Sequence, residues 1–427
     1  MSLYLGLLLA ILLEYVRPGG YFPIIDAVKV NSLVPLLVLL MTIFYKDGLD
    51  HKKIFGHPNS KWILFYMFLL VASILLSDVT HNSLTVFQTV LGYIFFYYMI
   101  LRLVTTLERL QGIMAVLVLS HVIVLGLNPV LITNPEVRSY IFGHTFMGDG
   151  NDFSLSVAIV LPMCVYLFLE SKKIIFKIYY LLSFFGLTLG VIGTQSRGAT
   201  IALVAVFLYL WFMAKRKIVG FVAILLVGIG VAFYAPDVYF ERMNTVSHYE
   251  DDGSAMGRII AWKTAMRMVA RYPLTGVGTG HFAVKLGTEF RPAEWGNKNL
   301  PWLTAHSMYF LTIGELGIPG ITFLLAIIIS NFFRNNRLLG LANGHVLASV
   351  RRYGLIIMFL NGSLIAFAFG GAFLSAIYYP HLYVLMGILT ATGFLLESEM
   401  RSQVVVEKQD VSVNFWEKSP SKTVWRD

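Results

Sequence analysis

Residues 174–193, IIFKIYYLLSFFGLTLGVIG, are the clearest indication of the fold class. These twenty residues carry one charge, Lys177, and about 20 mostly apolar residues are what an α-helix needs to cross a bilayer. The runs 153–171 and 197–214 on either side are also apolar. The sequence therefore predicts consecutive membrane-spanning helices rather than a soluble domain.

The composition of the whole chain favours the same fold class. Of the 427 residues, 57% are hydrophobic and 13% are charged, and the mean hydropathy is +0.71. A soluble domain carries roughly 25% charged residues. We therefore expect an all-α polytopic membrane protein, which excludes disordered, collagen-like, coiled-coil and disulfide-rich secreted classes. The single cysteine, Cys164, is interpreted as a buried helix residue.

About twelve stretches are apolar enough to be predicted as transmembrane helices. The first three are short, and the first two are candidates for tilted or partly re-entrant segments. The stretches lie near residues 2–16, 31–45, 62–77, 83–104, 110–131, 153–171, 174–193, 197–214, 218–236, 306–332, 353–376 and 378–398.

The basic residues between these stretches fall on alternate turns. Cytoplasmic loops are enriched in Lys and Arg, so both termini are expected in the cytoplasm. Because the cations spread over many short loops, the net charge of +9 does not indicate nucleic-acid binding. The first residues carry no basic charge, and no cleavable signal peptide is expected. Sixteen cations share the predicted cytoplasmic side: Lys46, Lys52, Lys53, Lys61, Arg102, Arg109, Lys172, Lys173, Lys177, Lys215, Arg216, Lys217, Arg334, Arg337, Arg351 and Arg352.

The pattern divides the chain into five parts. Transmembrane helices are expected at 1–150 (N-terminal), 151–236 (central) and 306–398 (C-terminal). One long external loop is expected at 237–305, and a polar cytoplasmic tail at 399–427.

A short polar turn, Gly193-Thr194-Gln195-Ser196-Arg197-Gly198-Ala199, is expected on the external face. Arg197 opens the following helix. An arginine at a helix end commonly extends to the membrane interface. Here the small residues Gly198 and Ala199 would let another backbone or a ligand come close, so Arg197 is also a candidate binding residue.

The external loop contains a predicted amphipathic helix at 257–269. Ile259, Trp262, Met266 and Val269 recur at helical spacing and are expected to form its apolar stripe. Its cations could contact lipid head groups, which is the expected role of Arg267 and Arg271. Arg258 is the candidate for binding a phosphate, because it is expected in the first helical turn, where free N–H groups and the helix dipole favour anions.

Three glycines alternate in Pro273-Leu274-Thr275-Gly276-Val277-Gly278-Thr279-Gly280. They permit a sharply turned backbone, but no Gly-Lys-Ser/Thr follows, so the run is a weak phosphate signal.

His306 lies where the loop enters the next predicted helix, with Tyr309 expected on the same helical face. A lone histidine is most often an ordinary hydrogen-bonded residue. At a membrane boundary it is also a base that can lose its proton near neutral pH. Glu315 lies about 13 Å farther along the helix, so it is expected to bond to a neighbouring helix or to the backbone around Pro319.

No metal site is expected in the external loop. It contains no HxH, HExxH or Asp-x-Asp pattern, and His248 and His281 have no partner at ligand spacing. The acidic run 250–252 is interpreted as solvated. No cofactor is predicted.

Taken in order, the motifs resemble the bacterial O-antigen ligase/O-antigen polymerase superfamily. They are Ser-Arg-Gly-Ala at 196–199, Gly-Arg-x-x-x-Trp at 257–262, the glycine run at 273–282 and Ala-His-x-x-Tyr with Glu-Leu-Gly at 305–317. Asn151 matches a polar position often seen in the family, whereas Ser307 stands where the family commonly has asparagine.

The resemblance implies an integral inner-membrane glycosyltransferase with its active site on the periplasmic face. Such an enzyme transfers a glycan from an undecaprenyl-diphosphate carrier to an acceptor hydroxyl, by inversion and without a metal. Carried over by position, Arg197 and Arg258 would hold the diphosphate and His306 would be the catalytic base. Tyr309, Asn151 and Glu315 are possible supporting residues.

Two alternatives remain open at this stage. Within the family, a polymerase would use another lipid-linked repeat as acceptor in place of a lipid A core, and a protein acceptor is also conceivable. From a different class, a transporter or flippase would favour ionisable residues at the bilayer midplane in repeated halves. No repeated halves are evident here.

Overall fold

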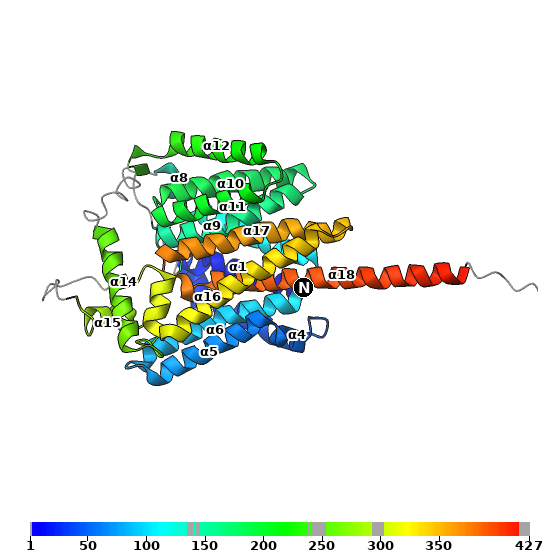
Figure 1. Cartoon of the computed structure of the whole chain (residues 1–427). Helices are drawn as coiled ribbons and strands as arrows, with labels where there is room; N and C mark the ends of the chain where they lie inside the picture. Colours follow the sequence, from blue (N-terminus) through cyan, green and yellow to red (C-terminus); the bar gives the residue numbers. More distant parts are fainter. Residues whose placement is uncertain are drawn as a thin grey trace, which may run out of the picture.

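The computed structural model describes residues 2–134, 140–141, 146–237, 239–240, 253–292 and 303–417, so His248 and the acidic run 250–252 lie outside the described residues. Within these ranges the chain is helical, without strands. The long helices form one bundle (Figure 1). They are α1 (Leu3–Val16), α3 (Val30–Ile43), α5 (Pro58–Leu76), α6 (Thr80–Leu103), α7 (Leu107–Leu127), α9 (Gly150–Glu170), α10 (Ile174–Gly193), α11 (Arg197–Met213), α12 (Lys217–Tyr234), α14 (Gly253–Arg271), α16 (Met308–Asn343), α17 (Ala348–Gly370) and α18 (Pro380–Glu417).

Short elements connect the long ones. They are the α-helices α2 (Pro23–Ala27), α4 (His51–Gly56), α8 (Val130–Thr133) and α15 (Phe282–Gly287), and the 3₁₀ turns η1 (Pro18–Gly20), η4 (Gly371–Phe373) and η5 (Ala376–Tyr378).

A helix occupies each of the twelve stretches predicted from hydropathy. In the described part of the chain, nine helical segments are long and apolar enough to cross a membrane. The apolar helices α3 and α11 are shorter, and α12 has 18 residues. The all-α polytopic membrane class is confirmed, and the number of twelve crossings stays a prediction.

Helices α9, α17 and α18 form the centre of the bundle. Their apolar windows are 78%, 67% and 83% buried, compared with 33% for the peripheral α10. Small residues let these helices approach closely, as is usual in membrane proteins. A Cβ added at Gly362 of α17, for example, would lie 3.4 Å from the ring of Pro162 in α9.

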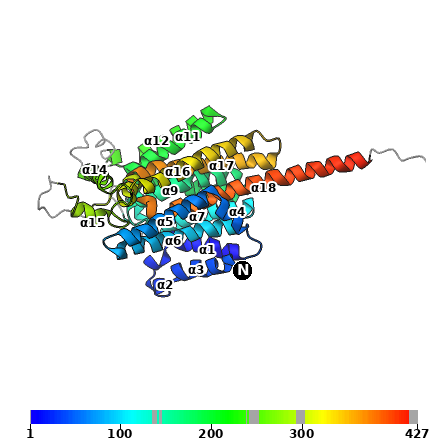
Figure 2. The same ribbon diagram turned by 60° about the horizontal axis from the view of Figure 1, so that its bottom comes forward.

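The two ends of the bundle differ in what they carry. Helices α14 and α15 lie at one end, called here the loop end (Figures 1 and 2). The N-terminus and the distal part of α18 lie at the opposite end, called here the basic end because it carries the turns with Lys172, Lys173, Lys215 and Arg216. Most of the predicted tail 399–427 continues α18 to Glu417, and residues 418–427 lie outside the described residues.

Candidate functional site

The turn that precedes Arg197 is held by hydrogen bonds at both helix ends. Ser196 caps α11, its Oγ accepting from the N–H of Ala199 at 3.3 Å. Thr194 Oγ1 lies 2.5 Å from Ser154 Oγ of α9. Between them, Gln195 adopts a left-handed backbone with φ of 55°. The turn that precedes Arg197, the first residue of α11, is therefore anchored to the N-terminal half of α9 through Thr194.

The expected close approach at Gly198 occurs, and the neighbour is η4. A Cβ added at Gly198 would lie 2.9 Å from Cβ of Phe373. A Cβ added at Gly371 would collide with the side chain of Met308, the first residue of α16. The η4 turn thus lies between the Arg197 turn and the start of α16.

Arg258 lies in the second turn of α14 rather than in the first. The helix begins at Gly253, four residues earlier than predicted, so the free N–H groups of the helix start precede Arg258. The expectation that helix-terminal N–H groups flank this arginine is therefore wrong. Arg258 itself is partly buried.

The buried face of α14 also differs from the predicted stripe. Met266 is 50% exposed, although Trp262 and Val269 are at least partly buried. Small side chains allow α14 to pack closely against α16. A prediction from hydropathy does not include this effect of side-chain size. The most buried α14 residues are Ala261, Thr264, Ala265 and Met268.

Trp262 fixes the α14 segment against the chain that leads into α16. Its indole N–H donates to the carbonyl of Ala305 at 3.0 Å. Its ring stacks on Phe310 with centroids 4.9 Å apart. One turn earlier, a Cβ added at Gly257 would lie 3.8 Å from Leu303. Arg258 is therefore beside the segment 303–306, which contains His306.

His306 is not part of a helix. It has a left-handed backbone with φ of 46°, and α16 begins two residues later, at Met308. The expected shared helical face of His306 and Tyr309 is therefore wrong. The backbone N–H of His306 donates to Thr304 Oγ1 at 3.5 Å. Thr304 Oγ1 in turn lies 2.7 Å from Ser375 Oγ, just after η4.

Tyr309 has a different partner, since its hydroxyl donates to the carbonyl of Ala368 in α17 at 2.9 Å. It joins α16 to α17. Asn151 lies in the first turn of α9, where its N–H and side-chain amide both donate to Asp149 at 3.2–3.3 Å. It is three residues before Ser154, which contacts the Arg197 turn.

Glu315 joins three elements. Its carboxylate accepts from the N–H of Phe282, at the start of α15, at 2.9 Å, and from the hydroxyl of Tyr378 in η5 at 2.5 Å. Burial, and then the charge of Glu315, raise the pKa of Tyr378 well above its usual value. The expected bond to a neighbouring helix is present. Tyr378 is a partner that spacing could not reveal, because it lies 63 residues away in the chain.

The glycine run, residues 273–280, donates hydrogen bonds to α16 where that helix is broken. Gly317 has a non-helical backbone with φ of 66°, and Pro319 has no N–H to donate. The carbonyls of Gly314 and Glu315 instead accept from the N–H groups of Val277 and Gly278 at 2.9 and 3.0 Å. Backbone groups within a membrane need such partners. The glycine run therefore completes the backbone bonds of α16.

Backbone packing explains why Gly276 is a glycine. Its φ is 63°, and an added Cβ would collide with the backbone of Glu315. On the other side of the run, Ser73 Oγ accepts from the N–H of Thr279 at 2.8 Å. The run is thus held between α5 and α16.

An ionic cluster joins α14 and α15 to the α5–α6 turn. Lys285 Nζ lies 2.5 Å from Asp78 and 2.7 Å from Glu289, and Arg271 lies 3.5 Å from Glu289. The hydrogen bond from Lys285, followed by its charge, lowers the pKa of Asp78. Hydrogen bonds from Lys285 and Tyr272 lower the pKa of Glu289, and those to Asp78 and Glu289 raise the pKa of Lys285.

The two arginines expected to contact lipid head groups are exposed and also bond within the protein, so the lipid contact stays a prediction. Arg267 donates to the carbonyl of Phe290 at 3.0 Å and to Thr264 Oγ1 at 2.9 Å. Arg271 pairs with Glu289.

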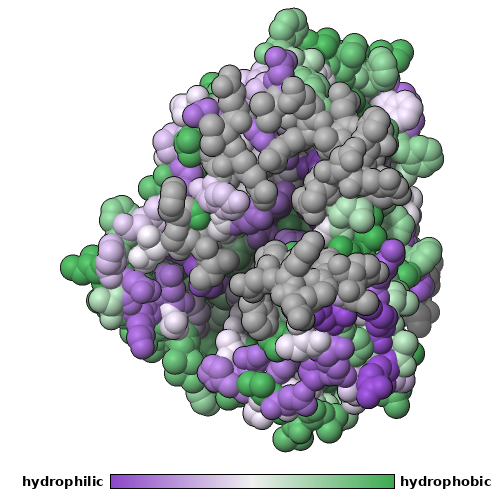
Figure 3. All heavy atoms as spheres, turned by 90° about the vertical axis from the view of Figure 1, so that its left-hand side faces the viewer, coloured by the Kyte–Doolittle hydropathy of each residue, from purple (hydrophilic) through white to green (hydrophobic). Residues whose placement is uncertain are grey.

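All six candidate residues identified from the sequence are placed at the loop end or on the elements that fix it. Hydrophilic side chains gather on this face around a central hollow (Figure 3). The turn before Arg197 contacts η4 through Gly198, and the segment 303–306 contacts Ser375, just after η4, through Thr304. Helix α14, which bears Arg258, contacts the segment 303–306 in turn, through Gly257 and Trp262. A further residue at this end is Tyr379, whose hydroxyl bonds to Asp152 of α9.

Residues 181–325 match the family model described as O-antigen ligase. This stretch contains Arg197, Arg258, His306, Tyr309 and Glu315, but not Asn151. The chain has no match among curated proteins. The family match confirms the resemblance that the motifs indicated. Residues 181–325 of this helical multi-pass membrane protein are therefore similar to the O-antigen ligase family.

Proposed function

We propose that the chain transfers a glycan from an undecaprenyl-diphosphate carrier to an acceptor hydroxyl, at the periplasmic face of the inner membrane. One observation carries the proposal: the segments bearing Arg197, Arg258 and His306 are distant in sequence but joined by contacts at the loop end. The Arg197 turn contacts η4, the His306 segment contacts Ser375 just after η4, and the Arg258 helix contacts the His306 segment. The O-antigen ligase match over the same segments supports it.

The arginines suit the leaving group. Arginine stays charged, and its planar fork matches phosphate oxygens. Arg197 and Arg258 would bind the diphosphate and offset the negative charge that develops on it as the glycosidic bond breaks. Since two fixed cations can supply this stabilisation, we propose that the transfer needs no metal.

His306 would act on the acceptor. The hydroxyl oxygen attacks the anomeric carbon from the side opposite the diphosphate, and the configuration inverts. The carbon–oxygen bond to the diphosphate breaks, and its electron pair leaves with undecaprenyl diphosphate. His306 takes the proton of the hydroxyl, a role that contributes roughly 10²–10⁴-fold in rate.

The positions of Tyr309, Asn151 and Glu315 suit supporting roles. Tyr309 fixes α16 to α17 directly after the His306 segment. Glu315 fixes the chain between α14 and α15 on α16. We propose that both residues position the site and do not touch the reacting atoms.

Deletion of the gene in its host, followed by surface-glycan gels, tests the proposal. A ligase deletion should remove acceptor-linked glycan and accumulate carrier-linked polymer. A polymerase deletion should leave single-repeat products, which would assign the other activity of the superfamily. An unchanged glycan profile would contradict both.

A further inference from the structure

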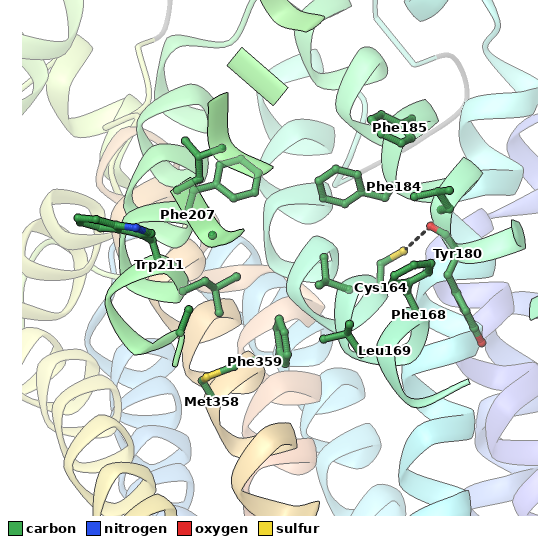
Figure 4. A pocket seen from close by; sticks show the side chains of 16 residues that line it. Cys164, Phe168, Leu169, Tyr180, Phe184, Phe185, Phe207, Trp211, Met358 and Phe359 are labelled. Carbon is green, nitrogen blue, oxygen red and sulfur yellow. Dashed lines mark hydrogen bonds between the residues drawn. The ribbon is translucent and has the colours of Figure 1, made fainter. Parts of the chain in front are cut away.

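An apolar cavity lies between α9, α10, α11, α12 and α17, away from the site at the loop end (Figure 4). It is formed by the halves of these helices that approach the basic end. Its volume is about 480 Å³, within the roughly 300–1,000 Å³ of ligand pockets. Its walls include Cys164, Phe168, Leu169, Tyr180, Phe184, Phe207, Leu210, Trp211, Met358 and Phe359.

The cavity wall suits a hydrocarbon chain. The thiol of Cys164 is engaged, since its Sγ donates to the carbonyl of Tyr180 at 3.3 Å. Phenylalanines from three helices, Phe168, Phe184 and Phe207, face the space (Figure 4). Each methylene buried in such a space contributes about 0.8 kcal/mol, whereas a polar ligand would find few partners.

Positive charge gathers at the end of the cavity that faces the basic end. The α9–α10 turn carries Lys172 and Lys173, and the α11–α12 turn carries Lys215 and Arg216, all exposed. Each turn directly follows residues that line the cavity, Leu169 and Ala214.

Two nearby charged groups are already engaged by the protein. Lys217 Nζ donates to the carbonyls of Trp211 and Phe212 at the end of α11. Glu170, the acidic residue at this end of α9, is paired with Arg352. The charge left to face an incoming group is therefore positive.

We propose that this cavity and its two basic turns bind one anionic phospholipid of the adjoining leaflet. An acyl chain occupies the cavity, and the phosphate lies among Lys172, Lys173, Lys215 and Arg216. Basic groups beside pockets between transmembrane helices are a recognised arrangement for anionic head groups.

The isoprenoid chain of the proposed donor fits this place less well. The donor's diphosphate is proposed to lie at Arg197, which is fourteen residues before Trp211 on the same helix. This separation corresponds to about 21 Å along the axis. An isoprenoid that reached the cavity from there would leave the four cations without an anion. The phospholipid proposal does not depend on the proposed transferase function.

Photolabelling of the full chain in nanodiscs tests the proposal. The probes are phosphatidylglycerol and phosphatidylcholine with the same photoreactive acyl chain, and labelled residues are mapped by mass spectrometry. We expect labelling of cavity residues such as Phe168 and Phe207, with phosphatidylglycerol favoured roughly 5-fold or more, the effect of about 1 kcal/mol from a single cation. Equal labelling by the two lipids would overturn the proposal.

Matched variants separate the cavity from the surrounding lipid. Leu210→Trp places an indole into the cavity and should reduce cavity labelling at least about 3-fold, whereas Leu208→Trp, on the exposed face of the same helix, should not. Equal effects of the two would contradict the proposal.

The head-group contact has its own control. Replacing Lys172, Lys173, Lys215 and Arg216 by Gln should remove the preference for phosphatidylglycerol. The same change at Lys46, Lys52, Lys53 and Lys61, four cations elsewhere in the sequence, should preserve it. Displacement of the phosphatidylglycerol probe by undecaprenyl phosphate as efficiently as by phosphatidylglycerol would assign the cavity to an isoprenoid and overturn the proposal.

Discussion

His306 and Gln195 both adopt left-handed backbones, with φ of 46° and 55°. Residues other than glycine seldom adopt this conformation, and such residues cluster at functional sites when their surroundings hold them. Here Thr304 and Ser375 hold the first segment, and Ser154 holds the second through Thr194. The segments that bear His306 and Arg197 are therefore held in this conformation by side-chain hydrogen bonds, and Arg17 and Lys29 adopt it at helix ends elsewhere.

The left-handed backbone makes asparagine the informative substitution at His306. Asparagine tolerates this conformation, so His306→Asn removes the base and keeps the local fold. We expect transfer to fall roughly 10²–10⁴-fold. In the unsubstituted protein, activity should fall at acidic pH as the imidazole takes up a proton. The measurement is the transfer rate between about pH 5 and 9. High activity of His306→Asn with an unchanged pH profile would assign His306 a hydrogen-bonding role only.

The prediction for Arg258 has a control residue on the same helix, Lys263. Arg258→Ala should lower transfer roughly 10–100-fold, since hydrogen bonds to charged groups contribute about 1.5–3 kcal/mol. Arg258→Lys should also be impaired, because a point charge does not reproduce the fork. Lys263→Ala removes an exposed cation of the same helix and should be neutral. The assay compares transfer rates at equal amounts of inserted protein, and equal rates for Arg258→Ala and Lys263→Ala would remove the arginine from the diphosphate site.

Among the elements, the long helices could be predicted and the break in α16 could not. Hydropathy located a helix at each of the twelve stretches, because the bilayer requires continuous apolar runs. Hydropathy does not indicate which backbone carbonyls lose their hydrogen-bond partners at Gly317 and Pro319. The glycine run that supplies those partners therefore looked like a weak phosphate motif.

The glycine run gives a stability prediction. Gly276→Ala should destabilise the docking of residues 273–282 and lower the thermal stability of the protein, because the methyl group meets the backbone of α16. Gly287→Ala, with no heavy atom within 4 Å of the added carbon, is the control. Thermal unfolding in detergent measures both. Equal melting temperatures would show that the run does not need to pack against α16.

The ionic cluster gives a prediction about pH and salt. Lowered pKa values of Asp78 and Glu289 mean that their stabilisation is complete above roughly pH 4–5 and is lost as the pH falls through the folded-state values. The raised pKa of Lys285 gives a contribution that is complete below about pH 10 and lost above it. Lys285→Met should therefore lower the protection factors of residues 272–290, the intrinsic exchange rate divided by the observed rate, severalfold at neutral pH. High salt or acid should lower the same protection factors in the unsubstituted protein. Lys263→Met is the control, and unchanged protection in Lys285→Met would show that the ionic cluster does not stabilise residues 272–290.

In the whole molecule, span counting predicted that the candidate segments share one end, which the structure bears out. It could not predict that η4 and Ser375 lie between them, because those contacts join residues 63 to 175 positions apart. The sequence-based prediction also placed the start of α14 four residues too late, because the sequence before Gly257 has no apolar signal.

The two ends of the bundle carry a topology prediction. The basic end should face the cytoplasm and the loop end the periplasm, because short cytoplasmic loops collect Lys and Arg. Reporter fusions after Lys53 and after Lys285 should report opposite compartments. Reports from the same compartment would contradict the orientation and place the site on the wrong side for the proposed reaction.

The most direct test of the central claim is glycan transfer by the purified chain in nanodiscs. The substrates are an undecaprenyl-diphosphate-linked glycan and an acceptor glycolipid, with excess chelator present. The account predicts one new glycosidic bond for each undecaprenyl diphosphate released, with the rate lowered roughly 10–100-fold in Arg258→Ala and unchanged in Lys263→Ala. Movement of the intact lipid-linked glycan across the bilayer with no new bond would contradict it and indicate a transporter.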